Sequence, residues 1–356
     1  MIKKIIYLSQ TRLDYSLNST CIKGLNKNGV ELVGLYVKDK GIQGFIQALT
    51  FYRRNSNNTD AVIVGYDSSV LLVFLRLFCR KQIVYNAVLS VYERMVISRG
   101  LASKFSVKAI YYWLIDFVAV HFANLVMVES RHQADYFKKI FKISPRKVYR
   151  NWIGVDEDNF FYDPAVPKFN VFTVLFRGAL MPEAGAEYAI KAAKILEGEN
   201  IKFIMIGGGL LLEKTQQLIN ELKPRNLEHI TYFVPYDKLR VIMQRCHLSL
   251  GQFSNHERLT RTIPHKAYES LAMRLPYLTV SNRGILELLT PDKTCLTCNP
   301  ADAKSLAEKI LWAKNNYLLV EEIAENGYKL YQGKLKSVIL AKNLLNRMDG
   351  VSRVAS

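Results

Sequence analysis

The stretch RTIPHKAYESLAMRLPYLTV, residues 261–280, holds one complete helix and the strand that follows it. Pro264 suits the start of a helix, and the pattern predicts a helix over residues 265–274. The short apolar run at residues 277–280 is typical of a buried strand. Helices that lead into buried strands are the repeating units of a parallel sheet with crossover helices.

The same alternation of apolar runs and helical segments extends over the whole chain of 356 residues. The predicted strands are rich in Val, Ile and Tyr, as expected for strands that helices cover on both faces. They lie at residues 5–8, 31–36, 61–64, 82–85, 125–128 and 147–149, and then at 171–176, 202–206, 230–233, 248–250, 277–280 and 295–297. Helices in the second half are predicted at residues 187–196, 210–222, 238–245, 265–274 and 303–314. We therefore expect an α/β fold of two doubly wound, Rossmann-like domains that face each other across a cleft.

Residues 151–170, NWIGVDEDNFFYDPAVPKFN, carry two prolines, several acids and no helical period, so we interpret them as a linker. The expected domains are residues 1–163 and 164–332. The last segment, residues 333–356, is basic and helical in pattern, and we expect it to pack back on the first domain. The acid triplet from Asp156 to Asp158 more often marks a local turn than a metal site, so no metal is assigned to it.

The composition is strongly basic, because 49 Lys and Arg stand against 31 Asp and Glu and give a formal charge of +18. Such a surface attracts nucleic acid, anionic lipid or phosphorylated substrates. The alternative is that the proteins of the source organism are basic in general, and that the charge reflects no specific partner. The sequence has no recognised nucleic-acid motif, so we do not expect a nucleic-acid partner. Five scattered cysteines, including Cys295 and Cys298, fit a reducing cytoplasm better than a disulfide framework or a zinc site.

Residues 109–128, AIYYWLIDFVAVHFANLVMV, form the strongest candidate for a membrane segment. Asp116 and His121 interrupt it, whereas a spanning helix needs an unbroken run of about 20 apolar residues. We predict a buried helix that leads into a strand, and we expect any membrane attachment to be peripheral. The basic and aromatic residues suited to an anionic membrane surface lie at 51–54, 76–81 and 138–150.

The start of the helix at residue 265 has the chemistry of an anion site. Arg261 precedes the helix and Lys266 lies in its first turn, beside free backbone N–H groups and the positive end of the helix dipole. Together these groups suit a diphosphate. Glu269, three residues beyond Lys266, shares its face and is placed to accept the hydroxyl groups of a ribose. The alternative is an ordinary amphipathic helix with a solvated Lys–Glu pair.

These residues resemble the donor-site stretch of glycosyltransferase family 4, the retaining enzymes of the GT-B fold. Similar segments occur in the family's order at LGQF (250–253), RGALMPEAGAEYAIKAAKIL (177–196), FIMIGGG (203–209), CIKGLNKNGVELVGLY (21–36) and from ANLVMVESRHQADYF (123–137) to IGVDEDNFF (153–161). The resemblance implies transfer of a sugar, most simply a hexose, from a nucleotide-sugar to a saccharide or lipid-linked acceptor. Such transfer would serve cell-surface polysaccharide or glycolipid synthesis, in the cytoplasm or peripherally on the inner face of the membrane. It implies no metal and no cofactor, because the nucleotide-sugar is a substrate.

The resemblance also implies roles for individual residues. Glu269 would hold the ribose, and Arg261 and Lys266 would hold the diphosphate and carry the catalytic charge. Further donor contacts are implied for Arg177, Gly178, Gly207, Gly208, Val234, Pro235, Arg258 and Pro264. Arg12 and Asn86 are expected on the acceptor side.

The sequence departs from the family at several of these positions. Many members carry two glutamates eight positions apart, and the first would fall at Arg261. The lysine that often follows the first strand of the second domain is replaced by Glu183 or Ala184. The loop at residues 9–18 has no glycine, and Asn86 stands where many members have Asp or His.

Two other functions fit parts of the sequence. Another GT-B enzyme, such as a sugar-nucleotide epimerase, would need acid and base residues in the cleft, and the sequence does not place them. A non-catalytic polyanion-binding protein would explain the charge but not the segments around Lys266.

Overall fold

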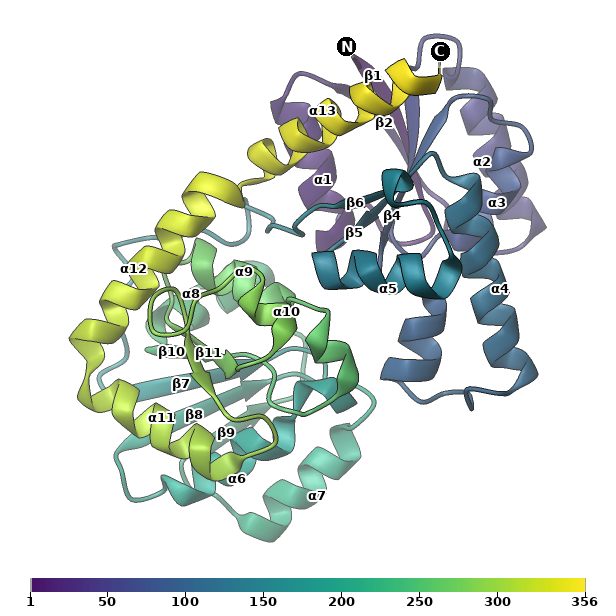
Figure 1. Cartoon of the computed structure of the whole chain (residues 1–356). Helices are drawn as coiled ribbons and strands as arrows, with labels where there is room; N and C mark the ends of the chain where they lie inside the picture. Colours follow the sequence, from purple (N-terminus) through teal and green to yellow (C-terminus); the bar gives the residue numbers. More distant parts are fainter. Residues whose placement is uncertain (1, 356) are drawn as a thin grey trace. The chain divides into compact units, whose positions relative to one another are not determined.

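The computed structural model describes the backbone of residues 2–355 and the side chains of residues 2–350. The chain forms two compact units, Met1–Asp156 with Leu335–Ser356, and Glu157–Lys334. Each unit contains one six-stranded sheet in which all strand pairs are parallel, with helices between the strands (Figure 1).

The sheet of the first unit has the order β2-β1-β3-β4-β5-β6. Its strands are β1 (Lys4–Ser9), β2 (Glu31–Tyr36), β3 (Ala61–Val64), β4 (Gln82–Val88), β5 (Leu125–Val128) and β6 (Val148–Arg150). The helices are α1 (Ser16–Lys27), α2 (Ile42–Asn55), α3 (Ser69–Arg76), the π-helix η1 (Glu93–Ser98), α4 (Val107–Phe122), α5 (Arg131–Phe141), the 3-10 turn η2 (Pro145–Lys147) and α13 (Ser337–Ala355).

Successive residues of β1 belong to two different core clusters, one on each face of this sheet. Ile5 and Tyr7 pack with residues of α1 and α13, whereas Ile6 and Leu8 pack with residues of α2 to α5. This alternation is the two-residue period of a strand covered on both faces. Helix α13 lies so close to α1 that a Cβ on Gly24 would be 2.3 Å from the carbonyl oxygen of Ser337.

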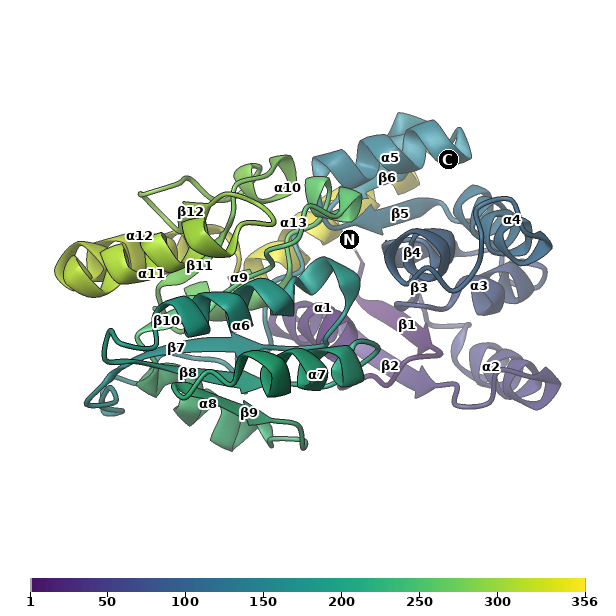
Figure 2. The same cartoon turned by 90° about the horizontal axis from the view of Figure 1, so that it is seen from below.

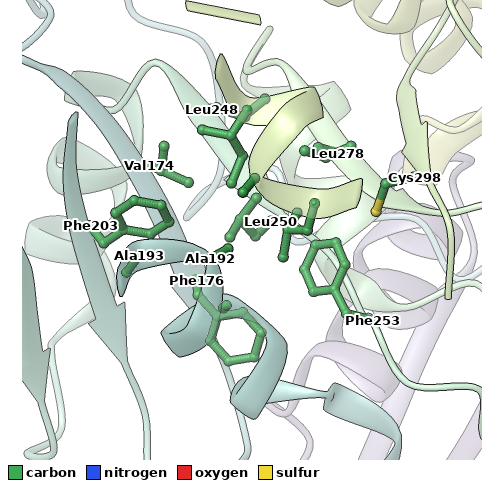
Figure 3. Packing of buried hydrophobic residues seen from close by; sticks show 14 of the residues in the cluster. Val174, Phe176, Ala192, Ala193, Phe203, Leu248, Leu250, Phe253, Leu278 and Cys298 are labelled. Carbon is green, nitrogen blue, oxygen red and sulfur yellow. The ribbon is translucent and has the colours of Figure 1, made fainter. Parts of the chain in front are cut away.

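The sheet of the second unit has the order β12-β11-β10-β7-β8-β9 (Figure 2). Its strands are β7 (Phe172–Arg177), β8 (Ile201–Ile206), β9 (Leu227–Ile230), β10 (Leu248–Leu250), β11 (Tyr277–Val280) and β12 (Leu296–Cys298). Helices α6 (Ala186–Ile195), α7 (Leu212–Leu222), α8 (Tyr236–Arg245), α9 (His265–Ala272), α10 (Arg283–Leu286), α11 (Ala303–Asn315) and α12 (Tyr317–Lys334) connect them, with 3-10 turns η3 (Pro182–Ala184) and η4 (Glu257–Thr260). Figure 3 shows side chains from β7, β8, β10 and β11 packed together in its core.

The structure corrects two expectations about the elements. The strand predicted at residues 230–233 lies instead at Leu227–Ile230. The prediction followed the apolar residues Tyr232 and Phe233, but both are exposed beyond the edge strand. Helix α12 was not predicted from the sequence pattern.

The apolar stretch at residues 109–128 does form a helix that leads into a strand, α4 followed by β5. The helix is not buried all round, however, because Val107, Ile110, Tyr111 and Leu114 are exposed. Among the described residues, no helix is long and apolar enough to cross a membrane.

Candidate functional site

The strand order of the second unit reverses between β7 and β10, and ligands bind outside the carboxyl ends of strands at such a point. Three glycines stand at this edge. Gly178 follows β7, Gly207 follows β8 and Gly251 follows β10. A Cβ on Gly207, whose φ is +152°, would lie 2.0 Å from the carbonyl oxygen of Gly178. The two loops therefore meet backbone to backbone, which only glycine allows.

Helix α9 places Lys266 against this edge. The ammonium group donates a hydrogen bond to the carbonyl oxygen of Gly251 at 3.0 Å and lies 4.1 Å from the ring centre of Phe176. A Cβ on Gly178 would be 3.2 Å from the Cε of Lys266. Lys266 is only 8% exposed. Burial, and secondarily the nearby Arg177, lowers its pKa to about 7.

Glu269, one turn further along α9, is 6% exposed and forms an ion pair with Arg177 at the end of β7. Burial lowers the pKa of Arg177 to about 10, so the guanidinium stays charged at neutral pH. Its Nε is buried without a hydrogen-bond partner among the described residues. The alternative of a solvated Lys266–Glu269 pair is therefore wrong, because both side chains are buried and each has another partner.

A second ion pair joins the half-buried Arg258 of η4 to the buried Glu183 of η3. Arg258 thus faces a carboxylate of the loop that follows β7. Arg261, at the end of η4, lies 3.8 Å from the carboxylate of Glu257, which is one turn earlier. Pro264 is the residue before α9 rather than part of its first turn, since its ψ of 149° is extended.

His265, the first residue of α9, was not singled out from the sequence. Both of its ring nitrogens are buried and have no hydrogen-bond partner among the described residues. Burial, followed by the charge of Arg177, lowers its pKa to about 4, so the imidazole is neutral at pH 7. The only signal in the sequence is its place between Pro264 and Lys266.

The loop before α8 and the first residue of this helix, Tyr236, hold further predicted and neighbouring residues of this unit. Val234 is buried and Pro235 precedes the helix. Tyr236 packs edge-on against Phe160, with 5.8 Å between ring centres. The ring centre of Phe160 is in turn 5.7 Å from the Cζ of Arg177. Gly208 accepts a hydrogen bond from the N–H of Leu180, which ties the loop after β8 to the loop after β7.

The two residues expected on the acceptor side lie in the first unit and play different parts there. Arg12 is exposed and pairs with Asp14. Asn86 is buried at β4, where its amide donates to the carbonyl of Leu17 at 3.0 Å and to the hydroxyl of Tyr7 at 3.4 Å. Among the described residues, no group of three or more His, Cys, Asp or Glu side chains could hold a metal ion.

Comparison with known proteins gives a family match to part of the chain and a likeness in fold. Residues 163–330 match the family model described as glycosyl transferases group 1. The search of curated proteins found no match.

Three solved structures illustrate the likeness in fold. HepE of Anabaena, in complex with UDP and glucose, aligns with a TM-score of 0.74 at 15% identity, over 98% of this chain and 100% of that chain. Sucrose-phosphate synthase of Thermosynechococcus elongatus gives 0.75 at 13% identity, over 99% and 100%. A glycosyltransferase of Rickettsia africae gives 0.68 at 14% identity, over 98% and 98%. At these identities the alignments establish the fold alone. The chain therefore has the two-domain, Rossmann-like GT-B fold, and the part of it that carries the Lys266 site matches the glycosyl transferases group 1.

Proposed function

We propose that this chain is a retaining glycosyltransferase of family 4 that binds a nucleotide-sugar at the carboxyl edge of the second sheet. The observation that carries the proposal is the buried charge at this edge. Two buried cations, Arg177 and Lys266, and the half-buried Arg258 stand with two buried acids, Glu183 and Glu269. The group therefore holds one more cation than acid in a largely buried place, and this excess costs free energy until an anion completes the site. A nucleoside diphosphate supplies that anion.

The partners of these cations suggest how the ligand would be held. Lys266 and the N-terminus of α9 are suited to the diphosphate, because both offer N–H donors in a buried place. Glu269 is suited to the ribose hydroxyls, and it would share its carboxylate between them and Arg177. The neutral His265 and the Nε of Arg177, to which no described residue bonds, are further donors in the same region.

The proposed reaction needs no metal and no cofactor. An acceptor hydroxyl attacks the anomeric carbon from the face that the diphosphate leaves, and the bond from that carbon to the phosphate oxygen breaks. Lys266 and Arg261 stabilise the charge that develops on the leaving diphosphate. A phosphate oxygen then accepts the proton of the attacking hydroxyl. The protein contributes position and charge rather than a nucleophile.

UDP is the first nucleotide to test, because HepE of Anabaena was solved in complexes with UDP and with UDP-glucose. We propose a hexose as the sugar, and a saccharide or lipid-linked molecule as the acceptor, in cell-surface polysaccharide or glycolipid synthesis. The basic composition supports a site of action in the cytoplasm at the inner, anionic face of a membrane.

The test is calorimetric titration of the full chain with UDP, GDP and ADP. We expect one of the three nucleotides to bind. Glu269→Ala should weaken this binding about 100-fold, because the ribose loses its hydrogen-bond acceptor and Arg177 loses its counter-ion. Glu213→Ala is the matched control, since Glu213 is exposed on α7. Binding of no nucleotide, together with tight and salt-sensitive binding of DNA or RNA, would favour a polyanion-binding protein instead.

A further inference from the structure

Helix α4 carries an apolar face that the described part of the chain leaves uncovered. Val107, Ile110, Tyr111 and Leu114 are spaced so that they share one side of the helix, and all are exposed, Val107 at 85%. The other side packs into the core, through residues that include Ala109, Ala119 and Val120. A helix that is apolar on both sides needs an apolar partner on both.

The loop before α4 extends this face. Leu101 is exposed, and Phe105 is 92% exposed. Figure 1 shows this loop joining η1 to α4, which also contact each other. We define the α4 patch as Leu101, Phe105, Val107, Ile110, Tyr111 and Leu114.

The exposed charged residues in the segment that carries the α4 patch have one sign. The exposed charged residues from 99 to 122 are Lys104 and Lys108, and Arg99 is half-buried. Asp116, the acid of this segment, is buried and accepts hydrogen bonds from Ser69 and the backbone of Tyr92. A second copy of the chain, with its charge of +18, would be repelled from this surface. An anionic partner is favoured.

A cavity of about 340 Å³ beside the α4 patch indicates which anionic partner. Tyr111, Tyr112 and Ile115 of α4 form one wall, so Tyr111 belongs to both the cavity and the patch. Charged side chains also line the cavity. Arg94 forms an ion pair with Asp67, and the ammonium group of Lys40 lies 3.9 Å from the same carboxylate. Its lining continues in apolar residues of two other helices, namely Phe45 of α2 and the exposed Val70 of α3.

This cavity lies where the strand order of the first sheet reverses, between β1 and β3, because Gln10 follows β1 and Asp67 lies in the segment after β3. Such a point is where open α/β sheets bind ligands. Charged groups in the lining, with apolar residues beside them, suit a molecule with a polar head and a hydrocarbon chain. A lipid bilayer presents such molecules, anionic charge and an apolar interior together.

We propose that the α4 patch docks on an anionic lipid bilayer, with Phe105 and its apolar neighbours among the acyl chains and Lys104 and Lys108 at the head groups. The proposal deepens the function proposed above by assigning its membrane face to residues 99–114. The sequence had pointed to other segments, at 51–54, 76–81 and 138–150. Burial of exposed apolar side chains and attraction of lysines to anionic lipid add to each other in such interfaces.

The test is co-sedimentation of the full chain with vesicles of phosphatidylcholine alone or mixed with phosphatidylglycerol. We expect binding to the mixed vesicles that weakens with salt. Phe105→Ser should weaken it about tenfold, because one aromatic side chain no longer leaves water. The double variant Lys104→Glu with Lys108→Glu should lower binding to the mixed vesicles by at least about tenfold. The matched control is Leu318→Ser, on the exposed side of α12, where Leu318 is 81% exposed; it should bind as the wild type does.

The proposal is overturned if the wild type does not bind the mixed vesicles, or if Phe105→Ser and Leu318→Ser behave alike. Self-association in sedimentation velocity that Phe105→Ser abolishes would also overturn it, in favour of an interface between copies. UDP titration of the same samples separates the two proposals. Vesicle binding without nucleotide binding would contradict the proposed transferase only, and nucleotide binding without vesicle binding would contradict the docking surface only.

Discussion

Both sheets reverse their strand order beside their first strand, between β1 and β3 in the first unit and between β7 and β10 in the second. The loops at these two edges differ. In the second unit, glycines after β7, β8 and β10 let backbones touch, and buried cations fill the space. In the first unit, the side chain of Asn18 ties the loop after β1, by hydrogen bonds to Ser9 and to the carbonyl of Arg12. The shared topology sets where each unit can bind a ligand, and the loop residues decide the chemistry.

The largest expected effect comes from the glycine contact of the second edge. Gly207→Ala would place a methyl group 2.0 Å from the carbonyl oxygen of Gly178, at a φ of +152°. We expect a loss of about 3 kcal/mol in the free energy of unfolding, and loss of nucleotide binding. Urea unfolding and calorimetry would measure both.

Gly198→Ala is the matched control for this change. A Cβ on Gly198 meets no atom within 4 Å, so its stability and binding should equal those of the wild type. If Gly207→Ala behaves as the wild type does, the loops after β7 and β8 can move apart without cost. The glycines would then not explain the difference between the edges of the two sheets.

Lys266→Met tests the buried charge. The pKa of Lys266 is lowered from 10.5 to about 7, so between these values the unfolded chain binds a proton that the folded chain does not. The wild type therefore gains stability as pH rises through this window. We expect the variant to be more stable near pH 7 by about 3 kcal/mol, with the difference shrinking toward pH 10.5.

The same variant should bind the nucleotide about 100-fold more weakly, because the diphosphate loses a buried cation. Thermal unfolding at a series of pH values, with calorimetry, would measure both effects. A variant that is less stable at every pH would mean that Lys266 is a structural residue, whose bond to Gly251 outweighs the cost of its burial.

Arg261→Ala should have a smaller effect than Lys266→Met. Arg261 is already close to the carboxylate of Glu257, and it lies outside α9. We expect transfer to fall about tenfold, with a smaller change in nucleotide binding, if Arg261 acts mainly on the developing charge of the leaving group. Initial rates with the nucleotide-sugar, compared with the Kd of the nucleotide, would separate these two effects. A loss of binding as large as that of Lys266→Met would place Arg261 among the main ligands of the diphosphate.

Asp116→Asn is expected to have the smallest effect on the nucleotide site, because it should leave nucleotide binding unchanged. Burial raises the pKa of Asp116 to about 7, from 3.8 in an unfolded chain. The folded chain therefore holds a proton that the unfolded chain releases, and the wild type loses stability as pH rises between these values. The amide of Asn mimics the protonated acid, so the variant should be more stable above pH 7, by at most about 4 kcal/mol, and equal near pH 4. Urea unfolding at both ends of this range is the measurement, and a change in nucleotide binding would mean that the two edges are coupled.

Much of the fold could be predicted because buried parallel strands leave a strong signal in the sequence. Runs such as Ala61–Val64 and Leu125–Val128 are apolar throughout and lie where the pattern predicts them. The signal fails at β9, an edge strand that pairs on one side only, since partly solvated residues need not be apolar. It also fails for one face of α4, because apolar spacing cannot distinguish a face that meets the core from a face that meets another partner.

The sequence by itself determined the positions of most strands, the glycine turns and the residue types at the start of α9, because these depend on local pattern and spacing. Only the tertiary structure decided that Glu269 pairs with Arg177 rather than Lys266 and that Arg258 pairs with Glu183. It also decided that both ring nitrogens of His265 are buried without a hydrogen-bond partner among the residues that the structure describes. These pairings join residues 75 to 92 positions apart. Burial and partner choice are set by what the rest of the chain packs around a side chain, and no local pattern contains that information.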